Sequence, residues 1–246
     1  MGFSCGIVGL PNAGKSTIFN ALTAAGSPVA AYAFCTIDPK EGTVAVPDRR
    51  LDALAEILAP QKRTPATLTF VDIAGLVEGA SRGEGLGNRF LGHIREMDAM
   101  VFVLRAFEDE NVSHSAATID PWSDLETVRA ELLLADLETV RRRMERQYKL
   151  VKIGDKEGKA EWDYLKGLDA HLDGGAPAAT FRPGTEREAA WQGGLFLLTA
   201  KPALLVANFG EDDLPDGGQR LEGLKARAAA EGLAVSELPV PLVYLD

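Results

Sequence analysis

Four short runs of apolar residues stand out along the chain because polar residues do not alternate with them. They cover residues 3–10, 67–73, 99–107 and 202–209, and isoleucine, valine, leucine or phenylalanine predominates in each. Continuous apolar runs of this length are typical of strands that are buried on both faces. The runs therefore predict the inner strands of a covered sheet.

Helical patterns lie between these runs, at residues 15–26, 49–59 and 87–98. Strands that alternate with helices predict an α/β fold with a mostly parallel sheet flanked by helices. Ligands of such sheets bind at the carboxyl ends of the strands. We therefore expect the functional site at that edge.

Residues 123–173 break this rhythm, because they are strongly charged and helical in pattern. Ser123 and Glu126 have the spacing of a capping box at the start of a helix. Residues 153–158 are expected to reverse the chain, and residues 174–186 to lead back to the sheet. The apolar positions of the two helices are Leu125, Val128, Leu132, Ala135, Val140, Met144 and Tyr148, then Ala160, Tyr164, Leu168 and Leu172.

This pattern predicts an antiparallel helical hairpin that projects from the sheet domain, although ordinary core helices would show similar spacing. The expected organisation is an α/β sheet domain at 1–122 and 185–246. The hairpin insertion and its linker would occupy 123–184.

Composition narrows the class of protein. The formal net charge of −10 argues against a broad basic face for nucleic acid, and we expect no DNA partner. No apolar run has the roughly 18–20 residues of a membrane span. Basic residues cluster at 141–149, where we expect a solvated helix face, although a local patch for nucleic acid stays open. The start of the chain lacks the pattern of a secretory signal, and two cysteines give no disulfide framework. We expect a cytoplasmic protein with no membrane partner.

The sequence GLPNAGKST at residues 9–17 has the spacing of a phosphate-binding loop. Gly9 and Gly14 allow backbone angles that a Cβ would obstruct, so that consecutive N–H groups can surround an anion. Lys15 would reach the β and γ phosphates, and Ser16 would offer its hydroxyl to Mg²⁺. The loop follows a buried-looking strand and precedes a helix, as this role requires.

Asp72 ends an apolar strand and opens the pattern D-x-x-G. In switch-type nucleoside triphosphatases such an aspartate holds Mg²⁺, here through water, and the Gly75 amide would meet the γ-phosphate. Thr36, in a loop before an edge strand, would complete the Mg²⁺ shell. An acid that caps a turn is the structural alternative for Asp72.

Leu76 occupies the position at which Ras-like enzymes place a glutamine that orients water. An aliphatic side chain cannot do this, so either hydrolysis is slow or another group assists. His93 is one candidate, and a surface or packing role is its alternative. Asn12 is another, because its amide oxygen could help to hold K⁺ near the phosphates.

The sequence VANFGED at residues 206–212 aligns with the guanine-reading pattern N-K-x-D. Asn208 and Glu211 keep the spacing, but Phe209 replaces the lysine. Adenine lacks the N2 amino group that a carboxylate would bind, whereas an asparagine amide can pair with adenine N6 and N7. Altered base reading, in favour of ATP, is the economical interpretation.

Together, these motifs resemble the Obg-like ATPase (YchF) family of translation-factor-class P-loop proteins, over nearly the whole chain to about residue 235. The resemblance implies an ATP-preferring enzyme with a helical hairpin and association with the ribosome. It also implies that Ser16 and Thr36 bind Mg²⁺ and that Asn208 and Phe209 contact adenine. The phosphate ligands that it implies are Asn12, Ala13, Gly14, Lys15, Ser16 and Thr17.

The sequence departs from this family in two respects. It has neither the usual serine-alanine-lysine segment after the last strand nor the usual C-terminal TGS domain, and NFGE stands where NVSE is usual. The leading expectation is a slow ATP-hydrolysing switch. A GTP-preferring enzyme of the wider Obg class and a nucleotide-gated binding module with negligible hydrolysis stay open.

Overall fold

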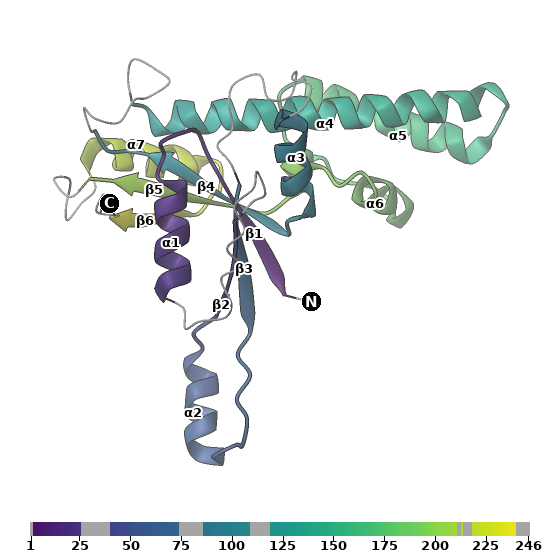
Figure 1. Ribbon diagram of the computed structural model, residues 1–246. Helices are drawn as coiled ribbons and strands as arrows, with labels where there is room; N and C mark the ends of the chain where they lie inside the picture. The colour runs from purple at the N-terminus through teal and green to yellow at the C-terminus, as the bar shows by residue number, and fades with distance from the viewer. Residues whose placement is uncertain are drawn as a thin grey trace. The chain divides into compact units, whose positions relative to one another are not determined.

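The computed structural model describes residues 2–25, 40–73, 86–108, 119–210, 213 and 218–239. Six strands form one sheet in the order β2-β3-β1-β4-β5-β6 (Figure 1). Only β2 and β3 pair in antiparallel fashion, and the other neighbouring strands are parallel, which confirms the expected fold class. The strands are β1 (Phe3–Val8), β2 (Lys40–Ala45), β3 (Thr67–Asp72), β4 (Ala99–Arg105), β5 (Ala203–Phe209) and β6 (Val235–Pro239).

The chain divides into two compact units. We call the first, Met1–Gly75, Met97–Pro121 and Ala203–Asp246, the sheet unit, and the second, Leu76–Glu96 and Trp122–Pro202, the hairpin unit. These units are defined by contacts between residues and do not test where one domain ends and the next begins. The predicted boundaries at 122/123 and 184/185 therefore stay predictions. The helices of the sheet unit are α1 (Lys15–Ala25), α2 (Arg49–Leu58) and α7 (Gly218–Ala230). Those of the hairpin unit are α3 (Leu86–Glu96), α4 (Pro121–Lys152), α5 (Lys156–Asp173), α6 (Glu186–Gly193) and the short 3₁₀ helices η1 (Ala178–Thr180) and η2 (Leu198–Ala200).

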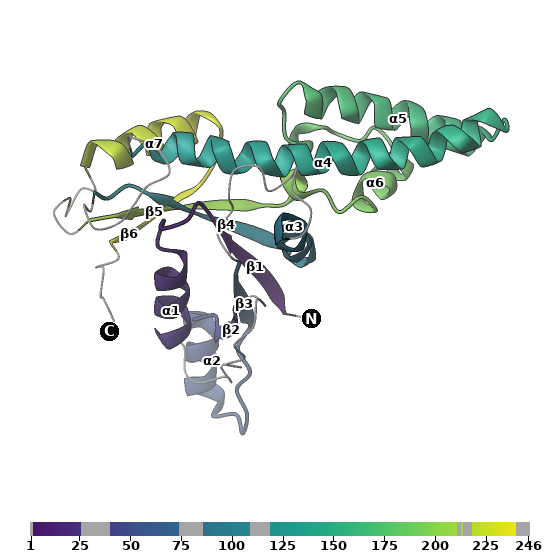
Figure 2. The ribbon, with the colours of Figure 1, turned by 45° about the horizontal axis from the view of Figure 1, so that its top comes forward.

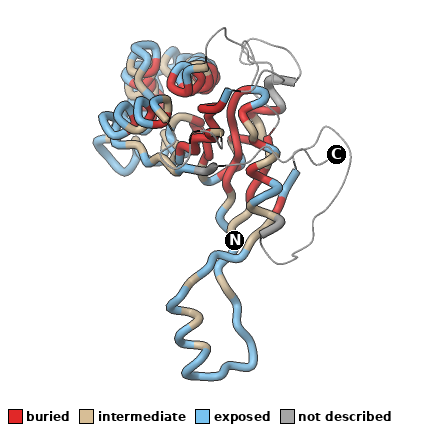
Figure 3. The backbone as a smooth tube through the Cα atoms, turned by 90° about the vertical axis from the view of Figure 1, so that its left-hand side faces the viewer, coloured by how far each residue is buried: buried red, intermediate tan, exposed pale blue. Residues whose placement is uncertain are grey.

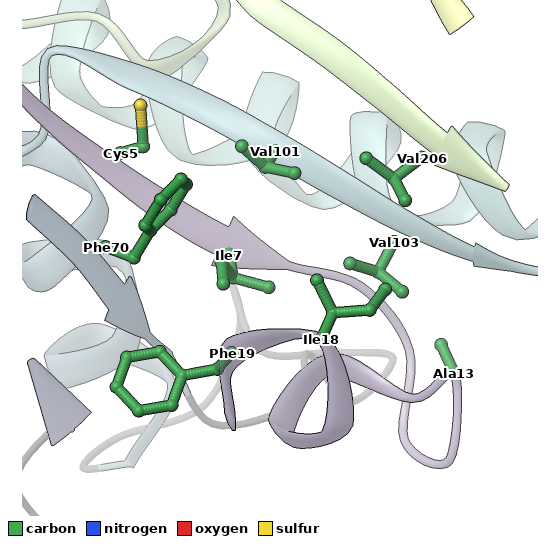
Figure 4. Packing of buried hydrophobic residues seen from close by; sticks show 9 residues of the cluster. All are labelled: Cys5, Ile7, Ala13, Ile18, Phe19, Phe70, Val101, Val103 and Val206. Carbon is green, nitrogen blue, oxygen red and sulfur yellow. The ribbon is translucent and has the colours of Figure 1, made fainter. Parts of the chain in front are cut away.

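The core of the sheet unit fixes the start of α1 against the inner strands. Ile18 and Phe19 of α1 pack with Ile7 of β1 and Phe70 of β3, and all four are at most 9% exposed (Figure 4). Buried residues gather along the strands, whereas α2 contains none (Figure 3). Burial of these side chains therefore sets the position of the loop between β1 and α1.

In the hairpin unit, α4 and α5 lie side by side in antiparallel directions (Figure 2). The chain reverses over residues 153–155, where Gly154 has a φ of +81° and Asp155 caps α5 by accepting a hydrogen bond from the Gly158 amide. Leu165, Leu168 and Leu172 of α5 are fully buried. The predicted hairpin is thus present in the structure.

The predicted capping box at the start of α4 is wrong. The helix begins at Pro121, so Ser123 lies within its first turn and is not the N-cap. The Glu126 carboxylate accepts a hydrogen bond from the Trp122 ring nitrogen at 2.9 Å. Proline suits this first turn because its missing N–H would have no helical partner there.

Asp136 of α4 ties the hairpin to the segment that follows it. Its fully buried carboxylate accepts hydrogen bonds from the Leu198 amide and from the amide and hydroxyl of Thr199, at 2.7–2.8 Å. Burial raises the pKa of Asp136, and the bonds from Thr199 and Leu198 oppose this rise. The carboxylate is therefore a packed polar link within the hairpin unit.

Helix α3 is bonded to the same unit. The Arg95 guanidinium donates to the Thr139 hydroxyl of α4 at 2.9 Å, and Lys201 donates to the Arg95 carbonyl at 3.0 Å. In the part of the chain that the structure describes, no helix combines the length and the hydropathy that a membrane crossing needs.

Candidate functional site

The loop between β1 and α1 is shaped by close approaches that only glycine permits. A Cβ on Gly9 would lie 2.4 Å from the Val103 carbonyl oxygen of β4. At Gly14, where φ is +92°, a Cβ would lie 2.2 Å from the Asn208 side-chain nitrogen. Asn12 also adopts a left-handed conformation, with φ at 62°, which asparagine tolerates. The loop is therefore held tightly against the ends of β4 and β5.

Lys15 is the first residue of α1 and is 8% exposed. Its ammonium donates a hydrogen bond to the Leu10 carbonyl at 2.8 Å, across the base of the loop. Burial lowers the pKa of Lys15, and the charge of Asp72 acts in the opposite direction. A buried ammonium at a helix N-terminus is well placed to bind a phosphate, whose charge would stabilise it.

Ser16 and Asp72 meet at the carboxyl end of β3. The Ser16 hydroxyl donates to the Asp72 carboxylate at 2.7 Å, and strand pairing places Asp72 beside Ile7. A hydroxyl and a carboxylate oxygen are hard oxygen donors of the kind that Mg²⁺ prefers beside substrate phosphates. The two residues therefore fit the bound Mg²⁺ that the sequence predicts.

Asn208, at the end of β5, bonds to the phosphate loop. Its side-chain nitrogen donates to the Ala13 carbonyl at 3.1 Å, which fixes the direction of the amide, because the oxygen could not face that carbonyl. The side-chain oxygen is buried and has no hydrogen-bond partner in the described chain. An unsatisfied buried acceptor costs stability unless a ligand donates to it.

The remaining predicted residues are only partly covered by the structure. Ala13 and Phe209 are each 2% exposed and Thr17 is half-buried in α1. His93 lies on α3, in the hairpin unit. The roles of Phe209 and His93 stay predictions. Four others lie outside the described residues, namely Thr36, Gly75, Leu76 and Glu211.

Arg105 is a residue of this region that the sequence reasoning missed. It is 1% exposed at the end of β4, pairs in register with Asn208, and donates to the Phe107 carbonyl at 3.2 Å. Its guanidinium also lies 4.5 Å from the centre of the Phe107 ring. A single arginine within the apolar run at 99–107 was the signal available, since an arginine there must be buried with partners.

The glycine-shaped loop, Lys15, and the Ser16–Asp72 pair together define a P-loop nucleoside triphosphate-binding domain. Comparison with known proteins agrees. The model of the 50S ribosome-binding GTPase family matches residues 4–138. The chain is 47% identical to the ribosome-binding ATPase YchF of Bacillus subtilis over 237 aligned residues, and this alignment covers 96% of the chain. It is also 44% identical over its whole length to the protein of that name from Buchnera aphidicola.

A solved structure shows the same likeness in three dimensions. The Schizosaccharomyces pombe YchF GTPase superposes with a TM-score of 0.81 at 38% identity, and the match covers 97% of this chain and 65% of that one. The chain belongs to the YchF family of P-loop proteins. It spans 64% of the length of the Bacillus subtilis relative and 68% of that from Buchnera aphidicola.

Proposed function

We propose that this chain is a Mg²⁺-dependent nucleoside triphosphatase that prefers ATP and acts as a slow molecular switch on the ribosome. The observation that carries the proposal is the hydrogen bond of 2.7 Å between Ser16 and Asp72, beside the buried ammonium of Lys15. Ser16 and Asp72, two of the three predicted metal ligands, thus lie side by side at the start of α1, which supports metal and phosphate binding there. Mg²⁺, when bound, neutralises charge on the β and γ phosphates.

Each residue of the proposed site has a defined role. Lys15 exchanges its bond with the Leu10 carbonyl for a bond with phosphate, and the loop amides surround the β-phosphate. Ser16 and Asp72 orient the metal, and Thr36 with Gly75 senses the γ-phosphate. Because Leu76 cannot orient water, hydrolysis is slow, and His93 or K⁺ held near Asn12 assists it.

Preference for ATP follows from the direction of the Asn208 amide. Its buried oxygen needs a donor, and adenine presents its N6 amino group, whereas guanine presents the O6 acceptor at the same place. One hydrogen of the amide nitrogen bonds to Ala13, and the second is available for N7. Two acceptors facing each other cost about 1–3 kcal/mol, so ATP should bind roughly 5- to 150-fold more tightly than GTP.

The ribosome enters the proposal through the names of the relatives, which are called ribosome-binding ATPases. Because this chain covers about two thirds of their length, the partner needs its own test. Co-sedimentation with ribosomes in the presence of ATP or ADP measures it. Retention of the chain in both states, or in neither, would contradict a ribosome-bound switch.

The preference between ATP and GTP is tested by letting the two nucleotides compete for the chain and measuring equilibrium binding in the presence of Mg²⁺. The expected result is a clear preference for ATP. A preference for GTP would overturn the assignment of Asn208 and support the alternative of an Obg-class GTPase, in line with the GTPase naming of the Schizosaccharomyces pombe relative.

Phosphate release tests catalysis in the same preparation. We expect slow turnover that is faster in K⁺ than in Na⁺ and faster with ribosomes. Equal rates in the two salts would exclude the proposed role of Asn12 in holding K⁺. If no phosphate is released under any condition, the chain is a binding module and not an enzyme.

A further inference from the structure

The end of the helical hairpin carries a chemistry that the nucleotide site does not use. Residues 146–159 contain five cationic side chains, Arg146, Lys149, Lys152, Lys156 and Lys159, and two acidic ones, Asp155 and Glu157. None of the five forms a salt bridge with a described residue, and all five are exposed. This segment of net charge +3 stands out in a chain whose net charge is −10.

Two aromatic rings and two lysines form a continuous row beside this charge. The Lys152 ammonium lies 4.7 Å from the centre of the Tyr148 ring, the Tyr148 and Trp162 rings are 5.8 Å apart, and the Lys166 ammonium lies 4.2 Å from the Trp162 ring. We call these four residues the cation–aromatic row. Lys166 also pairs with Asp163 at 2.9 Å.

Packing in the apolar core of the hairpin accounts for only part of this row, because Trp162 is half-buried whereas Tyr148 is exposed. The apolar core lies on other positions of α5, such as Leu165 and Leu168, which are fully buried, whereas Tyr148 is 46% exposed. Ile153, in the turn next to the row, is 78% exposed. Exposed cation–π contacts contribute only about 0.5–1 kcal/mol to stability. The row therefore offers a surface that a partner can cover.

We propose that the cation–aromatic row binds an unpaired segment of RNA. Aromatic faces stack on bases and lysines contact phosphates, a combination typical of proteins that bind single-stranded nucleic acid. Residues 148–166, which hold the whole row, carry five cationic and four acidic side chains, so this stretch is locally positive in a chain of net charge −10 and charge directs RNA to this end of the hairpin. The inference rests on the proposed ribosome association, and names ribosomal RNA loops as the chemical class that the hairpin contacts.

Anisotropy of a fluorescein-labelled single-stranded 12-mer of uridine, titrated with the full chain, measures this binding directly. The double variant Tyr148→Leu/Trp162→Leu keeps apolar side chains but removes both rings, and should lose at least tenfold in affinity. The variant Lys152→Gln/Lys166→Gln should bind more weakly and show a salt dependence of log K that is shallower by about 1.4, since each phosphate contact on a single strand contributes about 0.7.

The control is Arg49→Gln/Lys62→Gln, which removes the same charge from two exposed positions of the sheet unit and should leave RNA affinity unchanged. Far-UV circular dichroism shows whether the leucine variant keeps its helices. RNA affinity that is equal in wild type and both row variants would overturn the inference, as would an equal loss in the control.

Co-sedimentation of the same variants with ribosomes separates this inference from the proposed function. If the wild type binds ribosomes through the row but does not bind the RNA 12-mer, the row contacts a ribosomal protein and the inference is wrong. If the wild type binds the 12-mer through the row but not ribosomes, the RNA site holds and the proposed ribosome association fails.

Discussion

Gly14 carries two constraints at the residue scale. Its φ of +92° disfavours any L side chain, and the Asn208 amide nitrogen occupies the space that a Cβ would need. The same amide nitrogen donates to the neighbouring Ala13 carbonyl. The contact between the phosphate loop and Asn208 thus depends on the absence of a Cβ at Gly14.

Gly14→Ala should therefore reduce ATP affinity by at least tenfold, because the loop and Asn208 must move apart. Isothermal titration calorimetry measures the effect. The matched control is Gly223→Ala in α7, where a Cβ would meet nothing within 4 Å and the helix should gain about 0.5–1 kcal/mol of stability. Equal ATP affinity in wild type and Gly14→Ala would contradict this geometry.

Asp72→Asn tests the metal at the same scale. The amide can still bond with Ser16, but it brings no negative charge to Mg²⁺. We expect the wild type to bind ATP more tightly with Mg²⁺ than with EDTA, and the variant to lose most of that difference. A variant whose affinity responds to Mg²⁺ as strongly as the wild type would remove Asp72 from the metal site.

At the scale of elements, the apolar runs predicted the inner strands well. The runs at 67–73 and 99–107 correspond to β3 and β4, which end at Asp72 and Arg105. Long runs succeed because burial on both faces leaves little choice of side chain. The edge strand β6 and the short helix α6 were missed, since neither has a comparable apolar run.

The buried face of α5 shows why a pattern can slip by one residue. The sequence placed Ala160 and Tyr164 on it, but Ala160 is exposed and Tyr164 only partly buried against the core, whereas Glu161 and Leu165 are buried. Glu161 is paired with Arg143 at 2.7 Å and accepts from Gln147 at 2.6 Å. A buried glutamate looks like a surface residue in the sequence, because its partners lie on another helix.

The residues of the candidate site also differ in how well the sequence predicts them. Motif spacing indicated that Ser16 would lie near Asp72, and the structure joins them by a hydrogen bond, whereas their roles toward metal and phosphate stay predictions. The unsatisfied oxygen of Asn208 was not predictable, since it depends on the contact between Asn208 and Ala13, which are 195 residues apart. Long-range contacts of this kind leave no local signal in the chain.

Asp136 yields a pH prediction at this scale. Its pKa is raised in the folded protein, mainly by burial, so the stability that it contributes is greatest below its ordinary pKa of 3.8 and is lost as pH rises through the folded value. Asp136→Asn removes this titration. The free energy of unfolding of the wild type minus that of the variant should therefore decrease from pH 4 to pH 7 in urea titrations. An increase over this range would contradict the direction of the shift.

At the scale of the whole molecule, the phosphate loop and the hairpin core belong to different compact units. A bound nucleotide raises the free energy of unfolding only of structure that is coupled to its binding site. The increase is about 2.7 kcal/mol when the free nucleotide concentration is 100 times the Kd. Damage to the core of one unit should accordingly leave the ligand affinity of the other intact.

Leu168→Ala tests this separation. Leu168 is fully buried, so its truncation should cost the hairpin unit about 2–5 kcal/mol while ATP affinity stays within twofold of wild type. Leu150→Ala, the same change at a position that is 40% exposed, should cost less than about 1 kcal/mol. Thermal unfolding and calorimetric titration give the two readouts, and a parallel loss of ATP affinity in Leu168→Ala would show that the units are not independent.

Helix α3 is joined to the hairpin by hydrogen bonds, so the hairpin is not an independent insertion. The helix follows the Asp72 motif in the chain, yet its bonds through Arg95 run to Thr139 of α4 and to Lys201. Removing the hairpin as a cassette would deprive Arg95 of its acceptor on α4 and take away the core against which the rest of that unit folds. A chain shortened in this way would consequently alter the surroundings of α3 as well, and α3 is the first described helix after Asp72 along the chain.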